Sequence, residues 1–262
     1  MTTGQKRQPI SRRHSLRRVM KVRGTATVEE LCEELGASPA TIRRDLLALE
    51  QEGVIERGYG GATIRTIRPA EEELAIREQQ DVEAKRAIAL ATMQFIKSGS
   101  TVFLNDGSTI TVLAQQIAAS ELEIYIVTPA VNVANILVMN PKLTVCLLGG
   151  YVRRTSLATG GPFTESMLEM ISADLAIISC DAFSMRDGMC WNHAEDAAIA
   201  RKMSDRAAET IAVITGTKFD RRARISGVTA SDIDIVVTDN VRHAAAARLA
   251  QADVRIVEAS AS

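Results

Sequence analysis

The first 65 residues of the chain contain three runs of apolar positions with the spacing of an amphipathic helix. Residues at i, i+3, i+4 and i+7 share one face of a helix, and that face can be buried against a neighbour. The runs predict helices over about 12–23, 27–35 and 38–52 with one common core, made of Leu16, Val19, Met20, Val28, Leu31, Cys32, Leu35, Ile42, Leu46 and Leu49.

Polar residues mark where the second and third of these helices begin. Thr27 and Glu30 stand three apart and fit a capping box, in which each side chain bonds to a backbone N–H that the helix leaves free. Ser38 can cap the next helix through its hydroxyl, and Pro39 suits the first helical position because it has no N–H to leave unpaired. Two short helices joined by so tight a turn indicate a helix-turn-helix.

The third helix has the composition of a helix that reads DNA. Thr41, Arg43 and Arg44 lie off the apolar stripe in its first turns, where a recognition helix meets base edges and phosphates. Residues 54–57 and 62–65 then flank a glycine-rich segment, which predicts a hairpin, the wing. We expect a winged helix-turn-helix domain that contacts double-stranded operator DNA through Ser38, Thr41, Arg43, Arg44, Arg57, Tyr59 and Gly60.

Beyond residue 68 the pattern changes to short apolar runs that alternate with helical stretches. The runs predict strands at 101–104, 124–127, 143–148, 175–179, 210–214 and 233–237. Strands that alternate with helices favour an α/β domain with a mostly parallel sheet, in which ligands bind at the carboxyl ends of the strands. The sequence therefore predicts two domains, residues 1–68 and 69–262.

Charge divides the chain at the same place. Residues 1–68 carry 13 Lys and Arg against 8 Asp and Glu, whereas the remainder carries 18 against 24. The first 23 residues contain eight basic side chains and no acidic one. A charge run is often only a solvated surface, but beside a helix-turn-helix it is the electrostatic footprint of a domain that binds a polyanion.

Composition excludes several other classes of protein. No apolar run reaches the ~18 residues of a membrane helix, and the basic N-terminus lacks the apolar stretch of a signal peptide, so we expect a cytoplasmic protein. The four cysteines and three histidines show no metal-ligand spacing. We therefore expect no metal, no cofactor and no catalytic residues.

The first apolar run of the second domain leads into a polar turn, Asn105-Asp106-Gly107-Ser108-Thr109. Glycine frees the turn, the two hydroxyls supply donors, and the helix expected over 112–118 presents unpaired N–H groups at its start, a combination that suits a phosphate. From the spacing alone, a turn that caps its own helix explains the same residues. Both interpretations stay open.

Two motifs of the first domain match a known family. The helix Thr41-Ile42-Arg43-Arg44-Asp45-Leu46 and the segment Gly60-Gly61-Ala62 correspond to the TIRRDL helix and the GGA wing of the DeoR family of bacterial transcriptional regulators, which this domain resembles. Tyr59 stands where members commonly have His, a change in the detail of the wing. The resemblance implies a DNA-binding regulator.

The second domain is similar to the DeoR sensor domain in its turn at 106–109 and, less closely, at 127–129, 148–150, 180–188 and 215–219. That resemblance implies a Rossmann-like α/β fold shared with ribose-phosphate isomerases and CoA transferases, and an effector that is a phosphorylated sugar or related metabolite. It implies as effector-binding residues Asp106, Gly107, Ser108, Thr109, Thr128, Gly149, Gly150, Asp181 and Lys218.

Three positions depart from the family's pattern in the expected pocket. Pro129 replaces a side-chain amide, Thr215 replaces a carboxylate, and Ala200 stands where many members have Lys. Each change removes a polar group, so the resemblance implies an anion site tuned to an unusual remainder of the ligand. We expect His193 to pack beside Trp191 rather than to line this pocket.

Together these patterns predict a ligand-responsive regulator, a repressor of a carbohydrate or related catabolic operon that acts as a homo-oligomer. Two alternatives stay open. A sugar-phosphate isomerase-like enzyme would use Glu195 and Asp196, the only adjacent carboxylates in a plausible place, although it would have no use for a wing. A DNA-binding scaffold would bind no effector at all.

Overall fold

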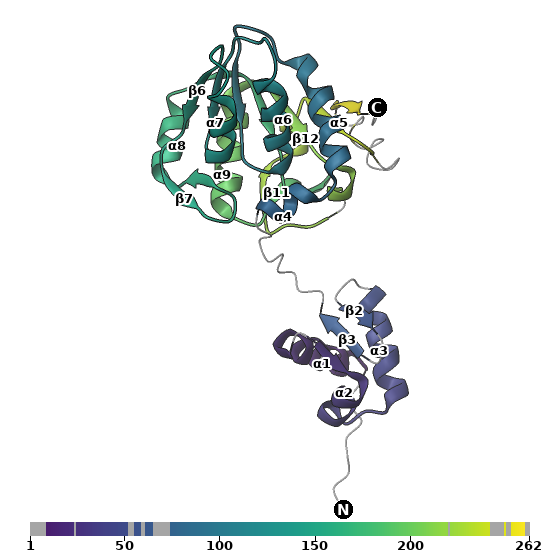
Figure 1. The fold of residues 1–262 in the computed structure, drawn as a ribbon. Coiled ribbons are helices and arrows are strands. Elements are labelled where there is room, and N and C mark those ends of the chain that lie inside the picture. Colours follow the sequence, from purple (N-terminus) through teal and green to yellow (C-terminus); the bar gives the residue numbers. More distant parts are fainter. Residues whose placement is uncertain are drawn as a thin grey trace, which may run out of the picture. The chain divides into compact units, whose positions relative to one another are not determined.

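The computed structural model describes residues 9–23, 25–51, 55–58, 61–64, 74–219, 221–241, 249 and 253–259. The chain forms two compact units, residues 1–70 and 71–262 (Figure 1). The domain boundary expected between residues 68 and 69 falls in a stretch that lies outside the described residues.

The small unit is a winged helix-turn-helix. Its helices are α1 (Pro9–Arg23), α2 (Val28–Leu35) and α3 (Pro39–Gln51), and its strands are β1 (Thr25–Thr27), β2 (Ile55–Gly58) and β3 (Gly61–Ile64). The strands form an antiparallel sheet in the order β1-β3-β2, so the predicted hairpin is confirmed and gains a third strand that the sequence pattern did not indicate.

Caps and core of the small unit follow the sequence closely. Thr27 and Glu30 make the predicted capping box at α2, and the Thr41 N–H donates to the Ser38 hydroxyl at 3.4 Å at the start of α3. The apolar faces of the three helices meet in one cluster, in which the buried side chains are Leu16, Val19, Met20, Ala26, Val28, Leu31, Ile42, Leu46, Leu49, Ile55 and Ala62.

A buried ion pair ties the first helix to the third. Asp45 is only 5% exposed, and its Oδ2 accepts a hydrogen bond of 2.5 Å from Arg12 Nε on α1. A carboxylate that is buried needs such a partner, because burying it alone costs several kcal/mol (~2–7 for a polar group, more for a charge). Asp45 therefore holds α3 in place, while Arg43 and Arg44 beside it are exposed.

The large unit is built on a seven-stranded parallel sheet in the order β15-β14-β12-β9-β4-β5-β6. Its strands are β4 (Thr101–Leu104), β5 (Tyr125–Thr128), β6 (Thr144–Leu147), β9 (Ala173–Ile178), β12 (Ala207–Val213), β14 (Ile235–Thr238) and β15 (Arg255–Glu258). All six predicted strands are confirmed, and β15 is additional.

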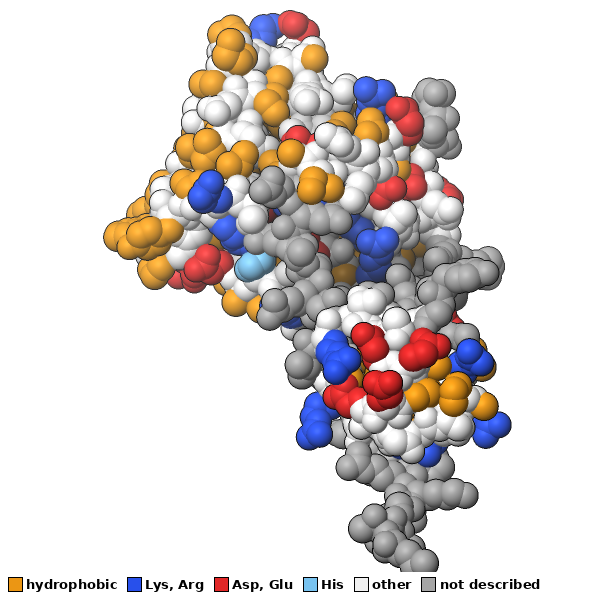
Figure 2. Space-filling model, turned by 60° about the horizontal axis from the view of Figure 1, so that its bottom comes forward, with side chains coloured by type: hydrophobic (Ala, Val, Ile, Leu, Met, Phe, Trp, Pro, Cys, Tyr) orange, Lys and Arg blue, Asp and Glu red, His pale blue; other side chains and the backbone are white. Residues whose placement is uncertain are grey.

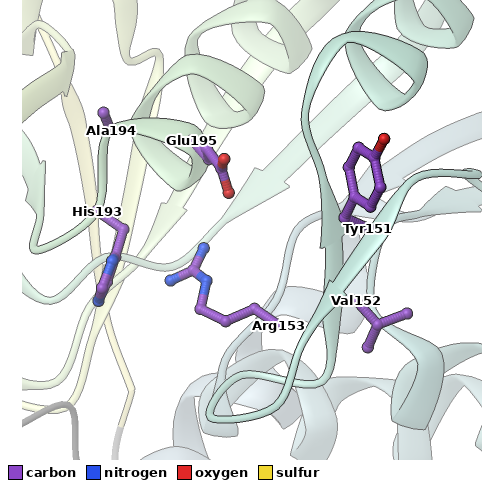
Figure 3. A pocket seen from close by; sticks show the side chains of 6 residues that line it. All are labelled: Tyr151, Val152, Arg153, His193, Ala194 and Glu195. Carbon is purple, nitrogen blue, oxygen red and sulfur yellow. The ribbon is translucent and has the colours of Figure 1, made fainter.

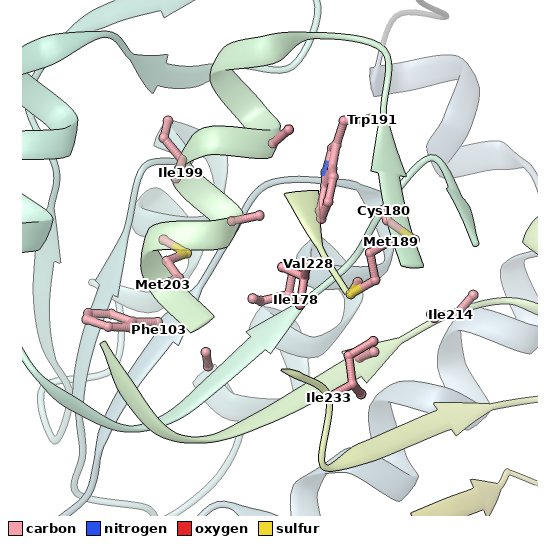
Figure 4. Close-up of a cluster of buried hydrophobic side chains, with 14 of the residues drawn as sticks. Phe103, Ile178, Cys180, Met189, Trp191, Ile199, Met203, Ile214, Val228 and Ile233 are labelled. Carbon is pink, nitrogen blue, oxygen red and sulfur yellow. The ribbon is translucent and has the colours of Figure 1, made fainter. Parts of the chain in front are cut away.

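Two hydrophobic clusters sandwich this sheet, as expected when strands are buried on both faces. The side chain of Phe103 packs on one face with α8 (Pro162–Glu169) and α9 (Ala194–Asp205), a cluster that includes Ile178, Trp191 and Met203 (Figure 4). Val102 and Leu104, its neighbours in β4, point to the other face, which α5 (Val82–Thr92), α6 (Ser108–Ala118) and α7 (Val131–Leu137) cover side by side (Figure 1).

Smaller elements complete the large unit at the edges of the sheet. One is a hairpin formed by β7 (Tyr151–Arg153) and β8 (Ala158–Gly160). Another is a small antiparallel sheet formed by β10 (Ala182–Ser184), β11 (Gly188–Trp191) and β13 (Ile225–Val228). The short helices are α4 (Leu74–Gln79), η1 (Met93–Phe95), η2 (Gly216–Lys218) and η3 (Ala230–Asp232). The sequence pattern did not indicate the two small sheets.

The order of the strands reverses between β4 and β9. From β4 the chain adds β5 and β6 on one side, and it then returns to add β9, β12, β14 and β15 on the other. Such a switch point opens a crevice at the carboxyl ends of the two strands. Asn105 bridges it: its amide donates to Ser179 O and accepts from Ser179 N, both at 2.9 Å, while the side chain is 2% exposed.

We expect Asn105→Ala to lower the free energy of unfolding of the large unit by about 2 to 4 kcal/mol, because it leaves two buried backbone groups of Ser179 unpaired at ~1–3 kcal/mol each. Urea denaturation followed by circular dichroism measures this. Asn135→Ala, at an exposed position of α7, is the matched control and should change little. Equal stability of the two variants would show that the bridge contributes nothing.

Candidate functional site

The exposed side of α3 presents the residues expected to face DNA. Arg43 and Arg44 are exposed, and the Thr41 hydroxyl lies 2.9 Å from that of Ser38. The Ser38 hydroxyl therefore caps the start of α3. Tyr59 and Gly60 lie outside the described residues, and Arg57 is described only through its place in β2.

The second candidate site begins at the N-terminus of α6. This helix begins at Ser108 rather than at residue 112, so Ser108 and Thr109 belong to its first turn and are buried. The residue before them, Gly107, has φ 118°, a conformation that favours glycine, and no side chain caps the helix. Self-capping therefore does not explain this turn. Thr109 Oγ1 is buried without a hydrogen-bond partner in the described part of the chain.

Lys218 lies across the crevice from this turn, at the end of β12. Its ammonium donates to Cys180 O at 2.6 Å and to Ser179 Oγ at 3.3 Å. A Cβ built on Gly107 would stand 3.7 Å from the same Ser179 hydroxyl, so the lysine and the uncapped helix start adjoin one side chain. Burial lowers the pKa of Lys218 from its usual value.

Three carboxylates share the crevice with these positive groups. Burial, and after it the charge of Asp196, raises the pKa of Asp106 to about 7. Asp196 makes a two-pronged ion pair with Arg153 of β7, of which the Nη1–Oδ2 bond is 2.8 Å. Burial nevertheless raises the pKa of Asp196. Carboxylates crowded in this way favour a ligand that brings hydrogen-bond donors or protons to them.

Asp181, the third carboxylate, is fixed from two sides. Its Oδ2 accepts from both the backbone and the side-chain nitrogen of Asn192 at 2.9 Å. Its Oδ1 lies 3.7 Å from Nη1 of Arg77, which comes from α4. Asp181 was expected from the sequence, but Arg77 and Arg153 were not, because an isolated Arg in a polar helix or hairpin is indistinguishable from a surface cation.

A hollow of about 490 Å³ lies on the surface beside Arg153 (Figure 3). Residues of β7 form one wall, the start of α9 forms the other, and the Arg153 side chain extends between them toward His193 and Glu195 (Figure 3). The lining residues are Tyr151, Val152, Arg153, His193, Ala194 and Glu195. None of the nine expected effector residues lines it, and His193, expected to pack, does.

The remaining expected residues shape the surrounding turns. The Thr128 hydroxyl is fully buried and accepts from Ala130 N at 3.1 Å. Gly149 O accepts a 2.6 Å hydrogen bond from Thr164. Gly150 has φ 147°, and a Cβ there would collide with Thr164 Oγ1 and the Gly160 carbonyl. The glycines therefore let the chain turn sharply from β6 into β7, which carries Arg153.

The three departures from the family pattern lie in apolar or satisfied surroundings. Ala200 is fully buried in the core under α9, and Thr215 is buried with its hydroxyl 3.1 Å from that of Thr217. The Pro129 carbonyl accepts from the Thr159 N–H at 2.8 Å. None of the three adds a charge to the crevice.

Two further findings concern the described residues alone. They contain no group of three or more His, Cys, Asp or Glu side chains that could hold a metal ion. Among them, too, no helix is both long and apolar enough to cross a membrane. The four cysteines are free thiols.

Family models match both units of the chain. Residues 12–68 match the DeoR-like helix-turn-helix domain, and residues 80–240 match the DeoR C-terminal sensor domain. The chain is similar along most of its length to curated regulators. One is the HTH-type transcriptional regulator GlpR of Haloferax volcanii, 32% identical over 88% of this chain and 90% of that protein.

Two other relatives are the HTH-type transcriptional regulator GolR of Listeria innocua, 29% identical over 88% of this chain and 91% of its own, and the lactose phosphotransferase system repressor of Lactococcus lactis, 28% identical over 85% and 88%. Among solved structures, ribose 5-phosphate isomerase A of Neisseria gonorrhoeae is 14% identical over 57% of each chain with a TM-score of 0.41, too distant to inform the function.

The winged unit, the parallel sheet with its crevice and the two family matches lead to one conclusion. A helix-turn-helix of this family binds DNA, and its sensor domain binds a small-molecule effector. The chain belongs to the DeoR family of transcriptional regulators.

Proposed function

We propose that this protein represses a carbohydrate or related catabolic operon and that a phosphorylated small molecule changes its affinity for the operator DNA. The observation that carries the proposal is the pairing of an uncapped α6 N-terminus with the half-buried Lys218 side chain at the switch point of the sheet. The name of one relative, a lactose phosphotransferase system repressor, supports a carbohydrate operon.

The operator contacts that we propose center on α3. Arg43 and Arg44 are exposed there, while Asp45 next to them is tied inward to Arg12. Guanidinium groups suit both phosphate oxygens and the O6 and N7 acceptors of guanine. We propose Thr41 as a third contact, with Ser38 at the helix start and Arg57, Tyr59 and Gly60 in the wing.

We expect Arg43→Ala and Arg44→Ala to weaken operator binding without unfolding the small unit. Loss of a phosphate contact lowers the salt slope by about one unit, and loss of a base contact costs ~1–3 kcal/mol and relaxes specificity at one base pair. Fluorescence anisotropy over a salt series measures both. Arg186→Ala, an exposed arginine of the large unit, is the control. Parental affinity in both α3 variants would contradict this assignment.

The effector site that we propose lies between Gly107 and Lys218. The first N–H groups of α6 and the ammonium both attract an anion, and Asp106 and Asp181 can accept hydrogen bonds from ligand hydroxyls. Ser108 and Thr109 bring hydroxyls to the same turn. Thr128, Gly149 and Gly150 would act through the turns that they hold.

We expect Lys218→Gln to reduce the thermal stabilisation that sugar phosphates give, with the half-saturating concentration rising about tenfold or more, because a charge-assisted contact is worth ~1.5–3 kcal/mol. Glutamine can still donate to Cys180 O, which protects the fold. Operator affinity without effector should stay at the parental value. A ligand that stabilises both proteins equally would place the anion elsewhere.

We propose that the crevice senses its ligand and does not transform it. An isomerase needs a carboxylate base that is free to take a proton. Here Asp196 is held by Arg153, and Asp181 is held by Asn192 and Arg77, so neither is available. Glu195 is exposed at the hollow, which none of the expected effector-binding residues lines. Product assays on each stabilising sugar phosphate test this, and turnover would refute it.

We propose that the regulator is a homo-oligomer, because a single helix-turn-helix covers too little duplex for tight specific binding. Apolar side chains gather on one flank of the large unit (Figure 2). The exposed ones on α7, β6, β7, α8 and the turns after them are Val138, Met139, Leu147, Tyr151, Val152, Phe163 and Met170. Since β6 is an edge strand, this flank suits a second copy of the chain.

Light scattering at micromolar concentration should give at least a dimer for the parent. Phe163→Glu should shift the protein toward the monomer, because it places a charge in the apolar flank. Leu90→Glu, at an exposed apolar position of α5 outside that flank, should leave the mass unchanged. A parent that is monomeric both free and on DNA would refute the oligomer.

A further inference from the structure

Arg77 occupies an unusual position for a surface arginine. It lies on α4, the first described element after the wing strand β3, and reaches into the crevice of the large unit. Its Nη1 is 3.7 Å from Asp181 Oδ1, close enough for attraction but too far for a hydrogen bond. Its Nε is buried and has no hydrogen-bond partner among the described residues. The guanidinium is therefore attracted by a carboxylate that does not satisfy it.

The charges around Arg77 are those of the proposed effector site. The guanidinium lies near Asp106, whose pKa it lowers against the effect of burial, and near Lys218 and Lys85, whose pKa values it lowers further after burial. Three cations, Arg77, Lys85 and Lys218, thus lie close enough to affect one another's charge. Such a concentration of positive charge attracts an anion.

Helix α4 is fastened to the same region at both ends. At its start, Leu74 N donates to Thr155 O at 3.0 Å, in the turn of the hairpin that carries Arg153. At its end, the buried Lys85 ammonium donates to the carbonyls of Arg77, at 2.5 Å, and Gln80. A change at Arg77 is therefore felt along the whole of this short helix.

The N-cap residue of α5, Asp81, is also held by the site. Asp81 has φ 48°, a left-handed conformation that is uncommon for a residue other than glycine, and its Oδ2 accepts a 2.8 Å hydrogen bond from Thr217. Thr217 stands next to Lys218 in η2. The junction between α4 and α5 is thus strained locally, and it is held by Thr217, the neighbour of Lys218, which we propose to bind the anion.

We propose that Arg77 is an anion-binding residue of the effector site, and that it exchanges its loose pairing with Asp181 for the anionic group of the effector, so that binding acts directly on α4. The proposal rests on the proposed effector site. A phosphate oxygen pair matches the planar fork of a guanidinium and supplies the partner that Nε lacks. The effector then contacts the helix that follows the DNA-binding unit along the chain.

If Asp181 and the anion compete for Arg77, substitutions at Arg77 and at Asp181 change the affinity for the anion in opposite directions. Removing the guanidinium weakens anion binding, whereas removing the charge of Asp181 strengthens it, because a competitor and a repelling charge are lost together. An ion pair that served only the fold would show the same sign for both substitutions. Asn at position 181 can keep its carbonyl oxygen on Asn192, so this turn is preserved.

The test titrates inorganic phosphate into the full-length protein at constant ionic strength and follows thermal unfolding. Arg77→Gln should raise the half-saturating phosphate concentration about tenfold or more, and Asp181→Asn should lower it about threefold or more. Arg86→Gln removes an exposed arginine of α5 that is paired with Glu83, and it should leave the titration unchanged. Each variant is first melted without phosphate to establish that it folds.

Hydrogen exchange of residues 74–81 supplies a second measurement. Saturating phosphate should slow exchange there in the parent but not in Arg77→Gln, even at phosphate concentrations that saturate the variant. Equal phosphate affinity of the parent and Arg77→Gln overturns the role of Arg77 while leaving the anion site at Lys218 intact. Weaker binding in both Arg77→Gln and Asp181→Asn overturns the exchange of partners, and no stabilisation of the parent by phosphate overturns the site itself.

Discussion

The sensor unit depends on one constraint, the reversal of strand order between β4 and β9. Connections that leave β4 and β9 in opposite directions cannot cover the carboxyl ends of these two strands, so polar backbone groups are left there below the surface. The amide of Asn105 satisfies a donor and an acceptor of Ser179 and holds the strand ends together. The α6 N-terminus, Ser179 and Lys218 take their positions from that bridge.

The charged groups of the crevice come from separate parts of the chain. Asp106 and Asp181 follow strands of the sheet, whereas Arg77 and Arg153 are brought in by a short helix and a hairpin. Asp181 and Asp196 are paired with Arg77 and Arg153, whereas burial, and after it the charge of Asp196, raises the pKa of Asp106. These charged groups interact with one another, so a charged ligand that binds among them changes the electrostatic energy of each.

The sequence predicted the architecture well because buried faces of helices and strands require apolar residues at regular spacings along the chain. Strands covered on both faces read as continuous apolar runs, and the helices of the small unit show a clear stripe with caps at Thr27 and Ser38. The edge strand β15 begins and ends with the exposed residues Arg255 and Glu258, and the strands of the β7–β8 hairpin are only three residues long, so neither shows such a pattern.

The site was only partly predictable. Gly107 and Lys218 follow strands of the parallel sheet, and ligands bind beyond the carboxyl ends of such strands, so the sequence pattern could indicate both residues. The start of α6 was placed four residues late, since Ser108 and Thr109 resemble turn residues until their burial is seen. Arg77 and Arg153 gain their role only through tertiary contacts with Asp181 and Asp196, which no local pattern records.

The buried pair of Arg12 and Asp45 bears on how loss-of-function variants of this regulator are to be understood. Asp45 lies next to Arg44 in α3, the helix that we propose to face DNA, yet its side chain is buried and joins α3 to α1. A genetic screen for lost repression would collect substitutions at both positions and give them the same phenotype. Those at Arg44 would act on the bound complex, whereas those at Asp45 would act earlier, by reducing the amount of folded regulator that the cell maintains.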